Sequence, residues 1–362
     1  MPDLSLSNFY NTTTIEKSSH TLITLYTFQI FQVAVSICAY GTLSACGVLT
    51  NIINMIIFVK LSLKDSMTLS LFALSVTDFS VSLLQLGMSL IYMIDEFYPT
   101  SSIDLWALSY LYLGWSTYTG YLISCWITAI ISVERCICVV APFTVREFST
   151  RNRCLCVIIC IYLIHIAAVL PVYITEPMQW VRVPAEDADP NATSAAQFFY
   201  TATLTDFSYE AESILDLVAG MILFLSSQTI LTVCSLWMTY SLKASSKVRT
   251  YCKVPKTYLE APTLKKSQLT VHERRLIKLV LSLAGLQIFC NLPRLAVTIL
   301  YNVMDGVSAK DEKYLNLIIW TSASFFNQIY CTANTVCYYF LNSKHRHMFQ
   351  QIFSSIEKKE NV

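Results

Sequence analysis

Seven apolar blocks dominate the sequence, each long enough to cross a lipid bilayer as a helix. A bilayer core of ~30 Å is crossed by about 20 apolar residues in a helix. The blocks lie at residues 33–59, 67–93, 107–138, 155–176, 212–240, 274–301 and 314–341. Membrane β-barrels instead show alternating segments of about 10 residues, which this sequence lacks. We therefore predict an all-α membrane protein, with a seven-helix transmembrane bundle at 33–341.

The remaining parts of the chain are short. Residues 1–32 are expected to form an extracellular head, and residues 342–362 an amphipathic eighth helix followed by a tail. Only 14% of the residues are charged, whereas soluble domains carry about 25%. The first 20 residues lack the basic start and apolar core of a cleaved signal peptide. We therefore expect the first helix to act as its own insertion signal.

The loop cations predict the orientation. Lysine and arginine gather after the first, third and fifth blocks and in the C-terminal tail. Because cytoplasmic loops are enriched in these residues, the N-terminus is predicted to be extracellular and the C-terminus cytosolic, at the plasma membrane. The glycosylation sequons at Asn11 and Asn191 both fall on the predicted outer side.

None of the thirteen cysteines falls in a predicted outer loop. No extracellular disulfide is therefore expected, and the second outer loop, at about 177–211, is predicted to be held by packing alone. The pairs Cys136 and Cys138, and Cys154 and Cys156, have no histidine nearby. They are interpreted as cysteines at the membrane boundary, and no metal site is predicted.

Four polar residues lie where the helices cross the inner half of the membrane: Asn51, Asp78, Ser124 and Asn334. Polar groups inside a bilayer are costly and mark candidate functional sites. A carboxylate with a hydroxyl and amides suits a hydrated cation such as sodium, or a proton, since hard cations prefer oxygen ligands. The alternative is a polar network that only joins the helices.

Several short motifs occur in a fixed order along the blocks. They are Leu74-x-x-x-Asp78 in the second, Glu134-Arg135-Cys136 at the end of the third, Cys290-x-x-Pro293 in the sixth and Asn334-x-x-x-Tyr338 in the seventh. Together with Asn51 they resemble the pattern of rhodopsin-like (class A) G-protein-coupled receptors across residues 33–353. Phrases such as Tyr338-Tyr339-Phe340 are similar to divergent molluscan chemosensory receptors. The resemblance implies a receptor that binds an extracellular ligand and activates a heterotrimeric G protein.

The resemblance also implies roles for individual residues. Arg135 matches the arginine that contacts the G protein, and Glu134 matches the acid that holds it at rest. Glu273, twenty residues before Pro293, is the candidate second partner of Arg135, although it could instead pair with basic neighbours on a solvated helix end. Pro293 is predicted to kink the sixth helix. Tyr338 is expected to swing inward on activation.

The sequence departs from the family pattern at several places. The outer cysteine of the third helix is replaced at about Tyr110, and the tryptophan of the fourth helix at about Ile161 or Tyr162. Asn291 stands where the family has a tryptophan in the sixth helix, and Thr335 stands where it has a proline in the seventh. The fifth helix has no proline. We therefore expect signal transmission to use different contacts.

The outer half of the predicted bundle gives hints about the ligand. Thr117 stands where amine receptors carry an aspartate, and Gln328 where opsins carry the retinal-binding lysine, which disfavours both ligand classes. Arg294 lies deep for a snorkelling cation. It could bind a small anionic ligand through its bidentate fork, or pair internally with Asp216. The candidate ligand contacts are Trp115, Thr117, Tyr118, Arg294, Phe325 and Gln328.

Other functions find less support in the residues. A transporter or channel should show internal repeats, broken helices or midplane charge pairs, and an enzyme should show a nucleophile motif or a catalytic pair of carboxylates. Neither pattern stands out in the sequence. Within the receptor class, a neuropeptide-type receptor is the alternative to a chemosensory one. We expect membrane lipid as a partner, no nucleic acid, and no cofactor apart from the candidate sodium ion.

Overall fold

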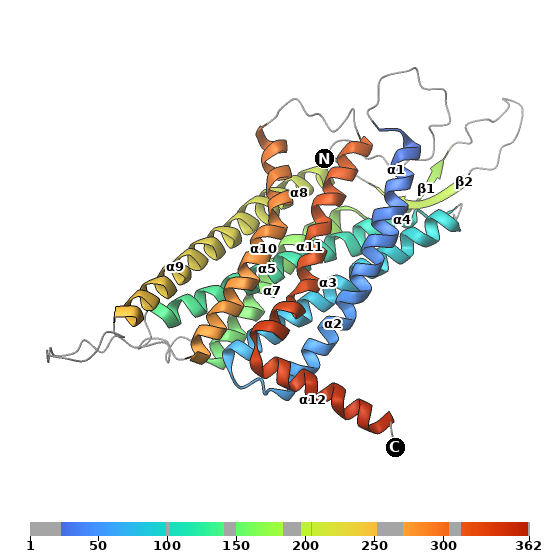
Figure 1. Cartoon of the computed structure of the whole chain (residues 1–362). Helices are drawn as coiled ribbons and strands as arrows, with labels where there is room; N and C mark the ends of the chain where they lie inside the picture. Colours follow the sequence, from blue (N-terminus) through green and yellow to red (C-terminus); the bar gives the residue numbers. More distant parts are fainter. Residues whose placement is uncertain are drawn as a thin grey trace, which may run out of the picture.

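The computed structural model describes residues 23–98, 102–140, 150–183, 197–203, 205–251, 271–303 and 313–360. Long helices pack side by side into one bundle, with a β-hairpin at one end and α12 at the other (Figure 1). We call these the hairpin end and the α12 end. The helices are α1 (Leu25–Phe31), α2 (Tyr40–Lys60), α3 (Ser66–Phe97), α4 (Leu105–Ser109), α5 (Trp115–Val140), α7 (Arg151–Thr175), α8 (Asp206–Leu215), α9 (Phe224–Tyr251), α10 (Val271–Val303), α11 (Lys313–Leu341) and α12 (Ser343–Glu360).

Three of the long helical stretches contain a π-helical segment. These segments are η2 (Gln32–Ala39) between α1 and α2, η3 (Tyr110–Gly114) between α4 and α5, and η4 (Asp216–Leu223) between α8 and α9. Each shifts the register by an inserted residue without breaking the helix. All three lie toward the hairpin end, so the helices depart from regular geometry mainly there.

Six helical stretches of the described chain are long and apolar enough to cross a membrane. They are Leu25–Lys60, Ser66–Phe97, Leu105–Val140, Arg151–Thr175, Glu210–Lys243 and Arg274–Leu300. Helix α11 packs within the same bundle against α2, α3 and α10. Large apolar side chains such as Leu163 on α7 and Trp237 on α9 are exposed on the outside of the bundle, as expected of a surface that faces lipid. The predicted all-α membrane bundle is confirmed.

Side-chain caps fix where several helices begin. The Asp65 carboxylate accepts a hydrogen bond from the Thr68 backbone N–H at 3.2 Å at the start of α3, and Asp104 accepts one from Ala107 at 2.8 Å at the start of α4. Asn342 caps α12 by accepting from the His345 backbone N–H at 3.2 Å. Such caps satisfy backbone donors that have no partner within the helix.

The segment after α7 forms a hairpin of β1 (Met178–Val183) and β2 (Gln197–Ala202), paired antiparallel with Met178 opposite Ala202. Asp104 ties the hairpin to the start of α4. Its backbone N–H donates to the Tyr200 carbonyl at 2.9 Å, and its carboxylate accepts from the Thr201 hydroxyl at 2.9 Å. The prediction that packing alone holds this loop was wrong, because backbone pairing and a buried aspartate also hold it.

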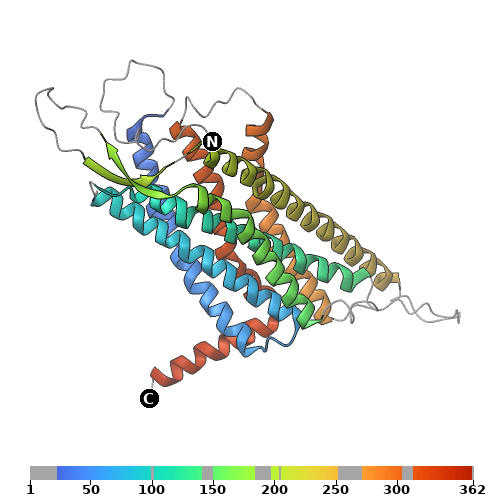
Figure 2. The same cartoon turned by 180° about the vertical axis from the view of Figure 1, so that it is seen from behind.

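Three apolar clusters of described residues lie in the bundle, and the third, around Tyr121 and Tyr330, joins α3, α5, α10 and α11. The cluster toward the α12 end joins α3, α5 and α10 through residues such as Leu74, Ile131 and Leu283, which are fully buried. The cluster toward the hairpin end joins η3, α5, α7 and α9 through Leu111, Trp115, Val172 and Phe224. Figure 2, which views the molecule from behind, shows α7 running along α3 and α5 on the side opposite to that seen in Figure 1.

Helices α2 and α3 approach each other closely at Gly47. A Cβ atom at this position would lie 2.5 Å from Ser82 Oγ and 2.9 Å from Thr332 Oγ1. Both hydroxyls accept hydrogen bonds from the Gln328 side-chain amide, at 3.0 and 3.3 Å. The missing side chain therefore allows α2, α3 and α11 to meet through these polar side chains.

Candidate switch site and polar core

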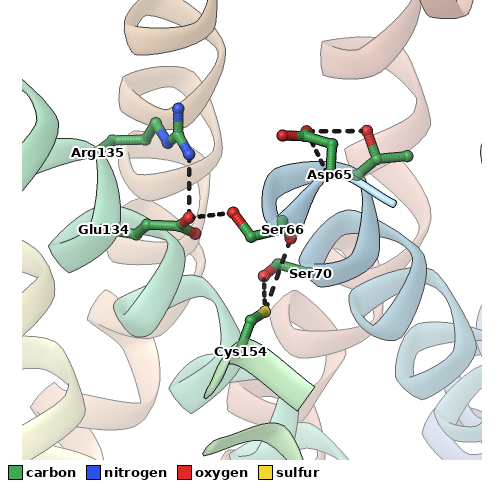
Figure 3. Close-up of polar contacts among 7 residues, drawn as sticks. Asp65, Ser66, Ser70, Glu134, Arg135 and Cys154 are labelled. Atoms are coloured by element: carbon green, nitrogen blue, oxygen red, sulfur yellow. Dashed lines mark hydrogen bonds and ion pairs between the residues drawn. The ribbon is translucent and has the colours of Figure 1, made fainter. Parts of the chain in front are cut away.

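Arg135 and Glu134 form an ion pair near the end of α5, at the α12 end of the bundle (Figure 3). Arg135 Nη2 lies 3.2 Å from Glu134 Oε1, and each side chain is only 13% exposed. The Ser66 hydroxyl, at the start of α3, donates to the same carboxylate oxygen at 2.5 Å. Glu134 therefore connects Arg135 to α3. A hydroxyl donated to an ionised carboxylate makes a charge-assisted hydrogen bond, which is stronger than a neutral one.

Helix α7 joins this region through Cys154. Its thiol lies 3.0 Å from the Ser70 hydroxyl and 3.7 Å from the Ser66 carbonyl oxygen (Figure 3). Ser66 is thus fixed from two sides, by the carboxylate it donates to and by the thiol that contacts its backbone. The starts of α3 and α7 and the end of α5 form one contact region.

The second predicted partner of Arg135, the side chain of Glu273, lies outside the described side chains. The Glu134–Arg135 pair is the one ion pair among the side chains that are described. Arg135 Nε is buried and has no hydrogen-bond partner within the described part of the chain. Among the described side chains, Glu134 holds the guanidinium through Nη2.

Asp78 is fully buried at the centre of the bundle, between α3, α5 and α11. One carboxylate oxygen accepts from the Ser124 hydroxyl at 2.6 Å, and the other accepts from the Asn334 amide at 2.7 Å. Three of the four polar residues predicted from the sequence therefore meet directly. The Asn334 Oδ1 atom is buried without a partner in the described residues, which leaves an acceptor oxygen at this site.

The fourth predicted residue, Asn51, belongs to the next layer. Its amide donates to the backbone carbonyls of Gly47 and Cys331, both at 3.0 Å. Its Oδ1 atom accepts from the Asn54 amide at 3.4 Å, and that amide also donates to Thr335 Oγ1 at 2.7 Å. Asn51 and Asn54 therefore join α2 to α11 in the place where Thr335 replaces the expected proline.

Pro293 and Tyr338 lie within the long helices in which the sequence motifs predicted them, α10 and α11. Tyr338 is fully buried and packs edge-on against Phe58 of α2, with ring centroids 5.3 Å apart. Pro293 lies inside α10, which runs through it from Val271 to Val303. A proline there leaves one backbone carbonyl without its helical donor.

A family model described as "7 transmembrane receptor (rhodopsin family)" matches residues 51–343. The chain belongs to this family. The matched range takes in the ion pair at Arg135, the Asp78 network and Tyr338. No match was found among curated proteins. A receptor of the rhodopsin type has a G protein as its partner, and the helices make it a multi-pass membrane protein.

In this receptor a hydrogen bond stands where the family has a tryptophan in the sixth helix. The Tyr121 hydroxyl donates to Asn291 Oδ1 at 2.5 Å, and both residues are buried. Next to it the Gln287 amide donates to the Cys125 carbonyl at 3.5 Å. Helices α5 and α10 are therefore joined by polar contacts. Asn291 could be recognised from the sequence as a departure from the family pattern, but its partner Tyr121 could not.

Arg294 lies one residue after Pro293, toward the hairpin end, and is 9% exposed. Its guanidinium carbon is 4.3 Å from the ring centroid of Tyr118, 5.5 Å from that of Phe224 and 5.9 Å from that of Trp320. These distances are those of cation–π contacts. Arg294 forms no salt bridge with a described side chain, and its Nε atom has no described hydrogen-bond partner. The Asp216 side chain lies outside the described ones.

The other candidate ligand contacts separate into two groups. Trp115 packs on Tyr118 with ring centroids 6.1 Å apart, and the Trp115 Nε1 and Thr117 Oγ1 atoms are buried without a described partner. Phe325 packs edge-on against Tyr40 at 5.1 Å, and Gln328 bonds to Ser82 and Thr332. The structure thus joins Trp115 and Tyr118 to Arg294, and places Phe325 and Gln328 against α2 and α3. The sequons at Asn11 and Asn191 lie outside the described residues.

Proposed function

We propose that this receptor binds an extracellular ligand in the half of the bundle nearest the hairpin and activates a heterotrimeric G protein at the α12 end. The observation that carries the proposal is the Arg135–Glu134–Ser66 contact, because a charged residue at a helix-bundle end held by a neighbouring acid can be released to a partner. The N-terminus then faces outward and the C-terminus faces the cytosol. This orientation and the chemosensory role rest on the loop cations and on the sequence resemblance.

The ligand that we propose is a small anion such as a carboxylate. Arg294 is a nearly buried cation whose described neighbours are aromatic rings. Rings attract a cation weakly, and an unpaired charge removed from water is unfavourable. A carboxylate would complete the guanidinium through two parallel hydrogen bonds. The buried Nε1 atom of Trp115, whose ring packs on Tyr118, offers a further donor.

The Asp78 network suits a small hard cation, and we propose that it holds sodium in the resting receptor. The oxygen atoms available are the Asp78 carboxylate, the Ser124 hydroxyl and the buried Asn334 Oδ1. Hard cations take oxygen ligands of this kind.

At the same end of the molecule as the switch, α12 would lie on the inner membrane surface, with lipid as its partner.

The test is a ligand screen in cells that carry a promiscuous G-protein reporter. The probes are small carboxylic acids, each paired with its primary amide. We expect an acid to activate the wild type, its amide to be inactive, Arg135→Ala to abolish signalling, and Arg294→Ala to abolish the response at normal surface expression. The matched control is Leu292→Ala, a side chain exposed on the outside of α10, which should leave potency unchanged.

Each arm of the screen has a separate meaning. Equal potency of acid and amide, or an unchanged response in Arg294→Ala, would contradict the anionic ligand. Full signalling by Arg135→Ala would contradict the assigned switch. A ligand-evoked current that persists with G-protein signalling blocked would favour a channel over a receptor.

A further inference from the structure

His345 is fully buried, although it lies on a helix whose neighbouring residues are exposed. Lys344, Arg346 and His347 all face outward on α12, whereas His345 has no exposed surface. Its ring packs against Phe58 of α2, with centroids 5.4 Å apart, and against Tyr338 of α11 at 5.7 Å. A histidine placed among two aromatic rings and removed from water needs a specific polar partner.

That partner is Asn54 of α2. His345 Nε2 lies 3.2 Å from Asn54 Oδ1, and the Asn54 amide nitrogen donates to Thr335 Oγ1 at 2.7 Å. Because Asn54 Oδ1 can only accept, Nε2 of His345 must carry the hydrogen and donate it. The other ring nitrogen, Nδ1, is buried without a partner in the described residues, so it is the unprotonated one.

The ring is therefore neutral. Burial lowers the pKa of His345 from 6.5 to about 4, because a cation among Phe58, Tyr338 and the helix backbones would lose its hydration. The neutral tautomer donates one hydrogen bond, and no other described hydrogen bond joins the side chains of α12 to α2. We call Thr335, Asn54 and His345 the α12 anchor.

We propose that His345 is a positioning residue for G-protein activation. The hydrogen bond that it donates to Asn54 fixes the start of α12 to α2 and, through Thr335, to α11. The anchor spans three helices through two hydrogen bonds, and its ring closes one side of Tyr338. Tyr338 has no exposed surface between the two rings. Because Asn54 bonds to both Thr335 and His345, a change in the position of α11 reaches α12 through these two hydrogen bonds.

The experiment uses the full-length receptor in lipid nanodiscs and measures hydrogen–deuterium exchange of residues 343–353, together with basal nucleotide exchange on a purified G protein. His345→Phe keeps an aromatic ring but removes the donor, and Asn54→Val removes the acceptor. We expect each to speed exchange in this part of α12 by about two- to tenfold, the range of one lost hydrogen bond. We also expect basal nucleotide exchange to change in the same direction for both variants.

Two further variants separate positioning from simple space filling. His345→Gln restores a side-chain N–H donor without an aromatic ring, so it should return exchange toward the wild-type rate, whereas a space-filling role would be met by His345→Phe. His347→Phe alters an exposed histidine of the same helix and should change nothing. The double variant His345→Phe with Asn54→Val should add little to either single change, because both remove the same bond.

The inference is overturned if His345→Phe exchanges at the wild-type rate, or if the effects of His345→Phe and Asn54→Val add in full. If His345→Phe fails to reach the membrane, the Asn54→Val and His345→Gln arms still decide. The signalling readout rests on the proposed function, but the exchange readout does not. Faster exchange without any nucleotide exchange on the G protein would support the anchor and contradict the proposed coupling.

Discussion

Neutralising Glu134 should raise the basal activity of the receptor, and the structure sets the size of the effect. The paired atoms of Glu134 and Arg135 are 3.2 Å apart and each side chain is 13% exposed. Coulomb's law at an effective dielectric constant of about 20 gives a gross attraction of ~5 kcal/mol at this distance. Desolvation and lost side-chain entropy offset most of it, and exposed pairs contribute only about 0–1 kcal/mol net. For a mostly buried pair that also accepts from Ser66, we expect about 1–2 kcal/mol.

This free energy stabilises only the state in which Arg135 is paired with Glu134. Its loss therefore shifts the equilibrium toward the state in which Arg135 is released. Since 1.4 kcal/mol is a tenfold change in an equilibrium constant, Glu134→Gln should raise basal nucleotide exchange about five- to thirtyfold while the active state remains a minor population. Ser66→Ala removes one donor to the same Glu134 oxygen and should raise basal nucleotide exchange by about two- to fivefold.

The assay is nucleotide exchange on a purified G protein, with equal amounts of each receptor variant in nanodiscs. Asp65→Asn is the matched control, because Asp65 lies next to Ser66 and caps α3 through Thr68 rather than contacting Glu134. Asparagine caps helices about as well as aspartate, so this variant should match the wild type. Glu134→Gln with the basal rate of Asp65→Asn would refute the reasoning that the ion pair holds the resting state.

Two further predictions concern stability. Gly47→Ala should lower the free energy of unfolding of the receptor by about 1–3 kcal/mol, because the new Cβ would lie 2.5 Å from Ser82 Oγ and 2.9 Å from Thr332 Oγ1. Gly285→Ala is the control and should be neutral or stabilising, because no atom lies within 4 Å of its added Cβ. Equal melting temperatures of the two variants would contradict the close approach at Gly47. Glu176, just past the end of α7, has its pKa raised from 4.5 to about 8 by burial and by Glu212. The folded state therefore prefers the protonated acid, and the free energy of unfolding should fall as the pH rises from 4.5 toward 8. Glu176→Gln should remove this pH dependence when thermal unfolding is measured at pH 5 and pH 8. An unchanged pH dependence would show that another group titrates.

The polar core could be anticipated from the sequence, because buried polar side chains in a membrane must find one another. Asp78, Ser124 and Asn334 lie in three different helices, and each has few other partners in an apolar surrounding. The contact of Ser66 with Glu134 could not be anticipated in this way. The two residues are 68 positions apart, and their meeting depends on the rotation of α3 and α5 about their own axes, which the apolar pattern does not determine.

The hairpin shows a different limit. A loop without cysteines suggested packing as its only support, but β1 and β2 pair through their backbones. Every residue except proline carries the donor and acceptor that make such pairing, so the side-chain sequence marks it weakly. Asp104 was also overlooked, because an aspartate before a predicted helix already has an ordinary role as its cap. Here it serves both as a cap and as the anchor of the hairpin.

The replaced tryptophan of the family pattern finds an explanation in α5. One face of this helix carries Tyr118, Tyr121, Cys125 and Thr128, spaced three or four residues apart as on one side of a helix. Tyr118 contacts Arg294, Tyr121 donates to Asn291, and Thr128 lies 2.6 Å from the Tyr330 hydroxyl of α11.

Thus α5 meets α10 and α11 through cation–π and hydrogen-bond contacts from the half of the bundle nearest the hairpin nearly to the ion pair at Arg135. A bulky indole in α10 would have to move between packing positions, whereas a phenol–amide hydrogen bond can exchange partners with a small rotation. These contacts along one helix face form a continuous path between the two ends of the bundle. In this receptor hydrogen bonds along α5, together with Asn54 and Thr335 on the other side of α11, take the places where the family pattern has a tryptophan and a proline.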